Sequence, residues 1–251
     1  VVTITGGIGR AAALAFAREG AHIALIDVNP EEMASTLTEC RQSGGNGLAL
    51  QGDVGQPDVV ARHLEAIVGA LGPVDVLVNN AGVMRRAASE DLAHETWREV
   101  MRINIDGAFY WAQAAAKQCM IPRERGAIVN VASIAGMAGI PNAAAYAASK
   151  HALVGLTRAL AVDWGRHDIR VNALCPGMTW SNLSRADLAR DPDMFVERQR
   201  RIPLGHAAEP HEQAEAIIFL ASDAASYVHG LVMNVDGGQI ALSSGHSAPR
   251  A

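Results

Sequence analysis

Short apolar runs alternate with longer helical patterns along almost the whole sequence. The runs are rich in β-branched residues and lie at 1–5, 21–27, 47–54, 74–82, 127–133, 169–177 and 231–238. Apolar strands that alternate with helices are typical of a parallel sheet covered on both faces. We therefore expect an α/β fold with a doubly wound, mostly parallel, seven-stranded sheet and helices on both of its faces.

The length and composition indicate one domain. A chain of 251 residues with 49% hydrophobic residues can bury one large core, so we expect residues 1–251 to form a single unit. Residues 178–210 interrupt the alternation because they are rich in charge and proline, and they predict a lid-like insertion.

Charge and cysteine usage exclude several classes of function. A net charge of −5 and scattered arginines give no basic surface for nucleic acid. Cys40, Cys119 and Cys175 lie far apart in sequence, which predicts neither disulfides nor a metal site and fits a reducing, cytoplasmic compartment. No apolar run reaches 18 residues and no charged-then-apolar leader opens the sequence, so we expect neither a membrane span nor a secretory signal.

The segment 133–150 holds three groups suited to proton transfer. If its second half is helical, Tyr146 and Lys150 lie four residues apart on one face, and Ser133 approaches from the end of the preceding strand. A nearby ammonium favours the phenolate, so we expect Lys150 to lower the pKa of Tyr146 from its usual ~10. Such pairs are usually surface contacts, but a chain with two lysines and three tyrosines rarely has this spacing by chance.

A glycine-rich turn between the first strand and the first helix suits a pyrophosphate. Gly6, Gly7 and Gly9 let the backbone approach a ligand, while the helix N-terminus offers free N–H groups. Asp27 ends the second strand, 18 residues after Gly9, where a carboxylate can bind the ribose hydroxyls of adenosine and repel a 2′-phosphate. Asp27 can equally be an ordinary turn residue, but with the glycines it indicates a Rossmann-type dinucleotide site that prefers NAD to NADP.

The sequence resembles the short-chain dehydrogenase/reductase family from Thr5 to Gly238. It reproduces the Ser-x12-Tyr-x3-Lys spacing of that family at Ser133, Tyr146 and Lys150. The resemblance also covers Asn104 in the long helix, Asp53 with Val54 after the third strand, Asn79-Asn80-Ala81-Gly82 after the fourth strand, and Pro176-Gly177 after the sixth.

The resemblance implies a role for each matched residue. Tyr146 would be the general acid-base, Ser133 would hydrogen-bond the substrate oxygen, Lys150 would hold the nicotinamide ribose, and Asn104 would anchor a water. It further implies a homotetramer. The expected cofactor contacts are Gly6, Gly7, Ile8, Gly9, Asp27, Asp53, Val54, Asn80, Ala81, Gly82, Tyr146, Lys150, Pro176, Gly177, Thr179 and Ser181.

One motif departs from the family pattern. The family loop reads T-G-x-x-x-G-x-G, whereas residues 5–9 read T-G-G-I-G, three residues fewer. Either the loop is truly shorter, or three residues are missing next to Gly7. Because the other cofactor motifs are intact, we expect the second explanation.

These features predict reversible hydride transfer between NAD(H) and a secondary alcohol or ketone, a small-molecule substrate. The alternatives are an NADP-dependent reductase of β-keto, acyl-carrier-type substrates and a dinucleotide-binding regulatory protein without catalysis. We expect a mainly apolar, medium-sized substrate pocket lined from the segment after Gly177 and from neighbouring loops, by Trp180, Leu183, Met194, Phe195, Met84, Met137 and Ile140.

Overall fold

The computed structural model describes residues 7–181, 184–185, 188–189 and 191–242. Its helices are α1 (Gly7–Arg18), α2 (Pro30–Gln42), α3 (Pro57–Leu71), α4 (His94–Met101), α5 (Gly107–Ala115), α6 (Ala144–Trp164), α8 (Pro192–Gln199) and α9 (Pro210–Ala221). Its strands are β1 (Ile23–Asp27), β2 (Gly47–Gln51), β3 (Val76–Asn79), β4 (Gly126–Val131), β5 (Ile169–Pro176) and β6 (Val232–Val235). The predicted alternation of strands and helices is confirmed.

The strands pair in parallel throughout. β1 pairs with β2, and β3, β4, β5 and β6 form a second group in that order. The described residues thus contain six strands of a doubly wound sheet. The seventh expected strand, at 1–5, lies outside the described residues, as does Gly6, so the two explanations of the short glycine loop stay open.

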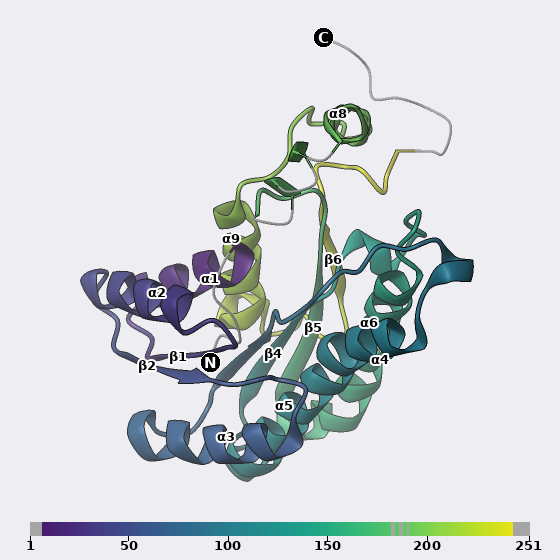
Figure 1. Ribbon diagram of the computed structural model, residues 1–251. Coiled ribbons are helices and arrows are strands. Elements are labelled where there is room, and N and C mark those ends of the chain that lie inside the picture. Colours follow the sequence, from purple (N-terminus) through teal and green to yellow (C-terminus); the bar gives the residue numbers. More distant parts are fainter. Residues whose placement is uncertain (1–6, 182–183, 186–187, 190, 243–251) are drawn as a thin grey trace.

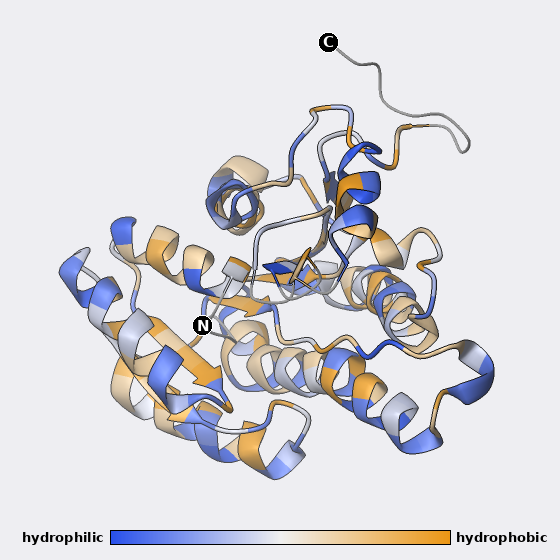
Figure 2. Cartoon of the chain, turned by 45° about the horizontal axis from the view of Figure 1, so that its top comes forward, coloured by the Kyte–Doolittle hydropathy of each residue, from blue (hydrophilic) through white to orange (hydrophobic). Residues whose placement is uncertain are grey.

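Helices cover both faces of the sheet (Figure 1). On one face, buried residues of α1, α2 and α9 form a core with Ile23 and Leu25 of β1. On the other face, buried residues of α3, α5 and α6 form a second core, which includes Ala24 and Ile26 of the same strand. Successive side chains of a strand point to opposite faces, so both faces of each apolar strand are buried. Figure 2 shows the same division, with hydrophobic strands inside and hydrophilic residues along the outward sides of the helices.

A chain of buried amides ties the centre of the sheet to α6. Asn79 of β3 donates to Asn130 of β4 (2.9 Å) and to the carbonyl of Ala108 (3.1 Å). Asn130 donates to the hydroxyl of Thr157 (2.9 Å), which donates to the carbonyl of Leu153. Buried polar groups that are satisfied in this way fix the relative positions of the elements that carry them. Asn79 therefore has a structural role, because it links β3 to β4 and to α5 through hydrogen bonds.

The segment after β5 has a small core of its own. Met178, Phe195, Ile202 and Ala207 are buried together, and the ring of Trp180 stacks on that of Phe195 with centroids 5.1 Å apart. Trp180 and Phe195, which we expected to line the substrate pocket, thus pack α8 onto the body of the protein. Leu183 lies outside the described residues.

Close backbone contacts fix where this segment begins. Gly177 donates its N–H to Val235 (3.0 Å), and a Cβ at Gly177 would lie 2.6 Å from Cα of Asp236. Only glycine fits such an approach between the end of β5 and the end of β6.

In the part of the chain that the structure describes, no helix is long and apolar enough to cross a membrane.

Candidate active site

A cleft of about 230 Å³ lies at the carboxyl ends of β3, β4 and β5, beside the start of α1. Ligands of parallel α/β sheets bind at this edge, because loops with free side chains follow the strands there. Ser133, Tyr146 and Lys150 all line the cleft, so the structure brings the three predicted catalytic groups together.

The ammonium of Lys150 is almost completely buried. The residue is 3% exposed, and Nζ donates to the carbonyl of Val131 at the end of β4 (2.8 Å). Nζ also lies 5.7 Å from the centroid of the Tyr146 ring. Burial disfavours the charged form of an amine and lowers the pKa of Lys150 from 10.5 to about 8.

The phenol of Tyr146 has a raised pKa, so the expected lowering is wrong. Burial disfavours the phenolate and is the largest influence on the pKa of Tyr146. The hydrogen bond with Ser133 and the charges of Arg198 and Arg86 act in the opposite direction but do not outweigh it. Sequence reasoning included the neighbouring lysine and omitted the loss of water around the phenol, which depends on the tertiary structure.

Asn104 is fully buried within a π-helical segment, η2 (Arg102–Asp106). Its Oδ1 accepts from the N–H of Val83 (2.8 Å), and its Nδ2 donates to the carbonyl of Val83 (3.0 Å) and to Ser149 (3.0 Å). Ser149 in turn donates to the carbonyl of Tyr146 (2.7 Å). Asn104 thus holds the loop after β3 against the first turns of α6, which fixes the position of Tyr146. Single π-turns are frequent at functional sites.

About half of the expected cofactor contacts line the cleft itself. Besides Tyr146 and Lys150, these are Ile8, Asn80, Gly82, Pro176, Gly177, Thr179 and Ser181. Gly7, the first residue of α1, has a φ of +50°, and a Cβ there would lie 3.4 Å from Cβ of Ser181. The start of α1 and the segment after β5 are therefore adjacent.

The remaining described contacts that we expected do not line the cleft. Asp27 ends β1, and its Oδ1 accepts from the N–H of Asn29 (2.9 Å). Asp53 follows β2, accepts from the N–H of Gly55 (2.8 Å) and pairs with Arg102 (2.7 Å). The structure does not place these residues on the cleft wall, nor Gly9, Val54 and Ala81, which lie in or against the core.

Sequence reasoning missed two charged residues of the cleft. Arg86, in the loop after β3, and Arg198, in the last turn of α8, both line it. Met84 and Ile140 line it as expected, whereas Met137 and Met194 are not among the lining residues. The expectation of a mainly apolar pocket is therefore incomplete, since two guanidinium groups share its wall.

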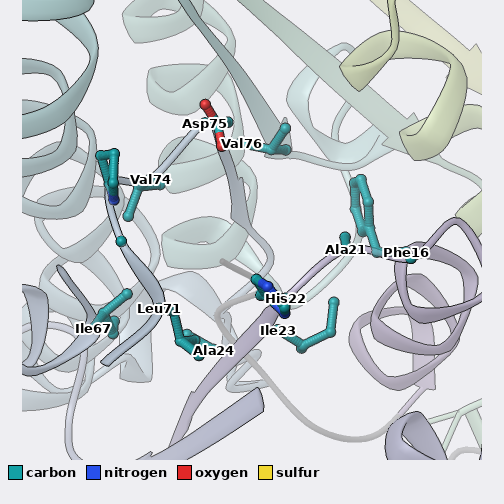
Figure 3. A pocket seen from close by; sticks show the side chains of 13 residues that line it. Phe16, Ala21, His22, Ile23, Ala24, Ile67, Leu71, Val74, Asp75 and Val76 are labelled. Carbon is teal, nitrogen blue, oxygen red and sulfur yellow. The ribbon is translucent and has the colours of Figure 1, made fainter. Parts of the chain in front are cut away.

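A larger hollow of about 300 Å³ lies at the opposite edge of the sheet, where β1 and β3 begin (Figure 3). Its lining is mostly apolar, with Phe16, Ile67 and Leu71 among its side chains. Its polar side chains are those of His22 and Asp75, and Asp75 pairs with Arg123. It lies away from the carboxyl ends of the strands, whereas Ser133, Tyr146 and Lys150 line the smaller cleft, so the smaller cleft is the candidate active site.

Comparison of the chain with known proteins identifies its family. Residues 2–239 match a family model described as Enoyl-(Acyl carrier protein) reductase. The chain belongs to the short-chain dehydrogenase/reductase family. It is an oxidoreductase of the kind that uses a nicotinamide dinucleotide.

Three relatives illustrate the range of this family. Gluconate 5-dehydrogenase of Gluconobacter oxydans is 37% identical, over 92% of this chain and 90% of its own length. Meso-2,3-butanediol dehydrogenase of Serratia marcescens is 37% identical, over 96% and 94%. The crystal structure of a gluconate 5-dehydrogenase from Burkholderia cenocepacia, in complex with NADP and tartrate, has a TM-score of 0.89 at 36% identity and covers 96% of this chain and 95% of its own.

Burial of the charged Lys150 ammonium reduces the free energy of unfolding. Lys150→Met should therefore stabilise the folded protein at pH 7. Below pH 8 the lysine is charged in the folded and unfolded states, so the full free-energy cost of burying the charge, about 3 kcal/mol, is present. Between pH 8 and 10.5 the folded state loses the proton first, so the advantage of the variant should shrink as the pH rises.

Urea unfolding at pH 7 and pH 9.5 measures this difference. Lys117→Met removes an exposed lysine, so this control should change the free energy of unfolding by less than about 0.5 kcal/mol at both values. A Lys150→Met protein that is less stable than the wild type at pH 7 would contradict the stated cost of burial.

Proposed function

We propose that the protein catalyses reversible hydride transfer between NAD(H) and a secondary alcohol or ketone, with Tyr146 as the general acid-base. The observation that carries this proposal is the position of Ser133, Tyr146 and Lys150 in one cleft beside the start of α1. A binding protein without catalysis has no need of a phenol and a buried ammonium at the same point.

The side chains divide the work around the substrate oxygen. When bound, the nicotinamide supplies or receives the hydride. Tyr146 gives its proton to the oxygen when a ketone is reduced and takes it back when an alcohol is oxidised, while Ser133 donates a hydrogen bond to the same oxygen. Lys150 binds the nicotinamide ribose, and Asn104 positions Tyr146 through Ser149 and anchors a water. With a raised pKa, Tyr146 is protonated at neutral pH and is ready to act as an acid.

The cofactor we propose is NAD. The carboxylate of Asp27 at the end of β1 supports this choice, because it would accept hydrogen bonds from ribose hydroxyls and repel a 2′-phosphate. The phosphates would lie at the start of α1, near Gly7, Ile8 and Ser181. The Burkholderia relative binds NADP, which makes NADP the alternative that must be assayed beside it.

We further propose a cytoplasmic homotetramer. Large apolar side chains are exposed near the ends of α6, α9 and β6, including Val162, Phe219, Tyr227 and Leu231. Such surfaces are suited to contacts between subunits. A monomer in light scattering at micromolar concentration would contradict this assembly.

Replacing Tyr146 by phenylalanine removes only the transferable proton. Tyr146→Phe should lower kcat at least about 100-fold, the lower end of what general acid-base catalysis contributes, and leave the Kd for NAD nearly unchanged. Tyr110→Phe, at a tyrosine that does not line the cleft, is the matched control and should keep wild-type activity. A Tyr146→Phe enzyme with more than about a tenth of the wild-type rate would contradict the assigned role.

The ratio of kcat/KM for NAD to that for NADP should favour NAD in the wild type. Asp27→Ala removes the negative charge at the end of β1 and should narrow this difference, mainly by improving the KM for NADP. Steady-state kinetics with one alcohol and both cofactors provides the measurement. Equal use of both cofactors by the wild type would refute the preference.

A further inference from the structure

Two hydrogen bonds join the end of β4 to α6. Nζ of Lys150 donates to the carbonyl of Val131 (2.8 Å), and Asn130, the preceding residue of β4, donates to the hydroxyl of Thr157 (2.9 Å). Lys150 and Thr157 are about two helical turns apart, so both lie on the buried face of α6. The first bond belongs to the active site, whereas neither Asn130 nor Thr157 lines the cleft.

The second bond has a single arrangement of donors and acceptors. The hydroxyl of Thr157 has one proton, which it donates to the carbonyl of Leu153 (2.8 Å), so its oxygen accepts from Nδ2 of Asn130. Oδ1 of Asn130 in turn accepts from Asn79 (2.9 Å). Asn130 and Thr157 are both fully buried, so water does not replace either partner. This series of bonds therefore points in one direction, from β3 to α6.

Asn130 and Thr157 are better suited than Lys150 to hold α6 in place on the sheet. Lysine has a long, flexible stem, whereas a β-branched threonine in a helix has a restricted χ1 angle. If α6 moved along β4, the stem of Lys150 would move with it. Nζ has little room for such movement, because a Cβ at Gly82 would lie 3.4 Å from it. The bond between Asn130 and Thr157 thus determines where Nζ lies in the cleft.

We propose that Thr157 is a positioning residue of the active site, because its hydrogen bond with Asn130 fixes α6 on β4 where Lys150 can bind the nicotinamide ribose. This inference rests on the proposed function, in which Lys150 binds the cofactor. Thr157 does not line the cleft and acts through Lys150. Loss of its hydroxyl should let α6 shift and should admit water to Nζ, which changes both turnover and the titration of Lys150.

Four proteins separate the hydrogen bond from general stability. Thr157→Val has nearly the same shape but lacks the hydroxyl, whereas Thr157→Ser keeps it. Asn130→Leu combined with Thr157→Val, the double variant, replaces both partners by apolar groups, a change that can be nearly neutral for stability. Leu160→Ala is the control, because it removes buried packing from the same helix and leaves the bond intact. Urea unfolding establishes that each protein is folded under the assay conditions.

The titration of Lys150 reports on its position without any substrate. The chain has two lysines, so a 13C label at the lysine ε carbon gives two NMR signals, and the signal lost in Lys150→Met identifies the residue. Its midpoint should be about 8 in the wild type and should rise toward 10.5 in Thr157→Val and in the double variant, because water reaches the ammonium. It should not change in Thr157→Ser or Leu160→Ala. Tyr146 and Cys175, the ionisable groups near Nζ, are the same in all of these proteins.

Turnover is measured at saturating NAD with an alcohol that the wild type oxidises. A small displacement of a catalytic group lowers the rate strongly, so kcat should fall at least about 10-fold in Thr157→Val and in the double variant. Thr157→Ser and Leu160→Ala should stay within about 3-fold of the wild type. Wild-type kcat in the double variant would overturn the inference, and so would an equal rise of the Lys150 midpoint in Leu160→Ala.

The two readouts distinguish this inference from the proposed function. If the wild type oxidises no alcohol but the Lys150 midpoint rises in Thr157→Val and not in Leu160→Ala, the positioning role is supported and the proposed reaction fails. If the wild type oxidises an alcohol and Thr157→Val matches it in kcat and in the titration of Lys150, the positioning role is refuted and the reaction stands.

Discussion

The buried ammonium of Lys150 is the constraint on which the rest of the active site depends. It lies at the end of β4, where the carbonyl of Val131 is its hydrogen-bond acceptor, and burial brings its pKa down to about 8. Such a group is tolerated only if the surrounding backbone is held in place. The two hydrogen bonds between Asn104 and Val83, and the one that Asn104 donates to Ser149, hold the adjoining loop and α6. The amide chain through Asn130 holds the strands beneath them.

Burial and positive charge act in opposite directions on the pKa of the Tyr146 phenol. Burial raises the pKa of Tyr146, while Arg198 and Arg86 oppose this effect. The balance of burial and charge decides how readily the phenol keeps its proton, and a change at either arginine should alter the titration of the phenol.

Local patterns determined what could be predicted from the sequence. The alternation of strands and helices and the spacing of Ser133, Tyr146 and Lys150 depend on residues close together in the chain. The direction of the Tyr146 pKa shift, the arginines in the cleft and the stacking of Trp180 on Phe195 depend on how distant loops pack. Sequence spacing contains no measure of burial or of loop position, so these features became apparent only in three dimensions.

The titration of Tyr146 in the free protein tests the electrostatic balance of the site most directly. The chain has three tyrosines, so a 13C label at the tyrosine ζ carbon gives a simple NMR spectrum, in which the signal lost in Tyr146→Phe identifies the residue. Its midpoint should lie above the ordinary value of ~10 and rise further in Arg198→Gln, which removes an opposing positive charge. A midpoint below ~10 in the wild type would show that positive charge, not burial, controls the phenol, and would contradict the balance described for this site.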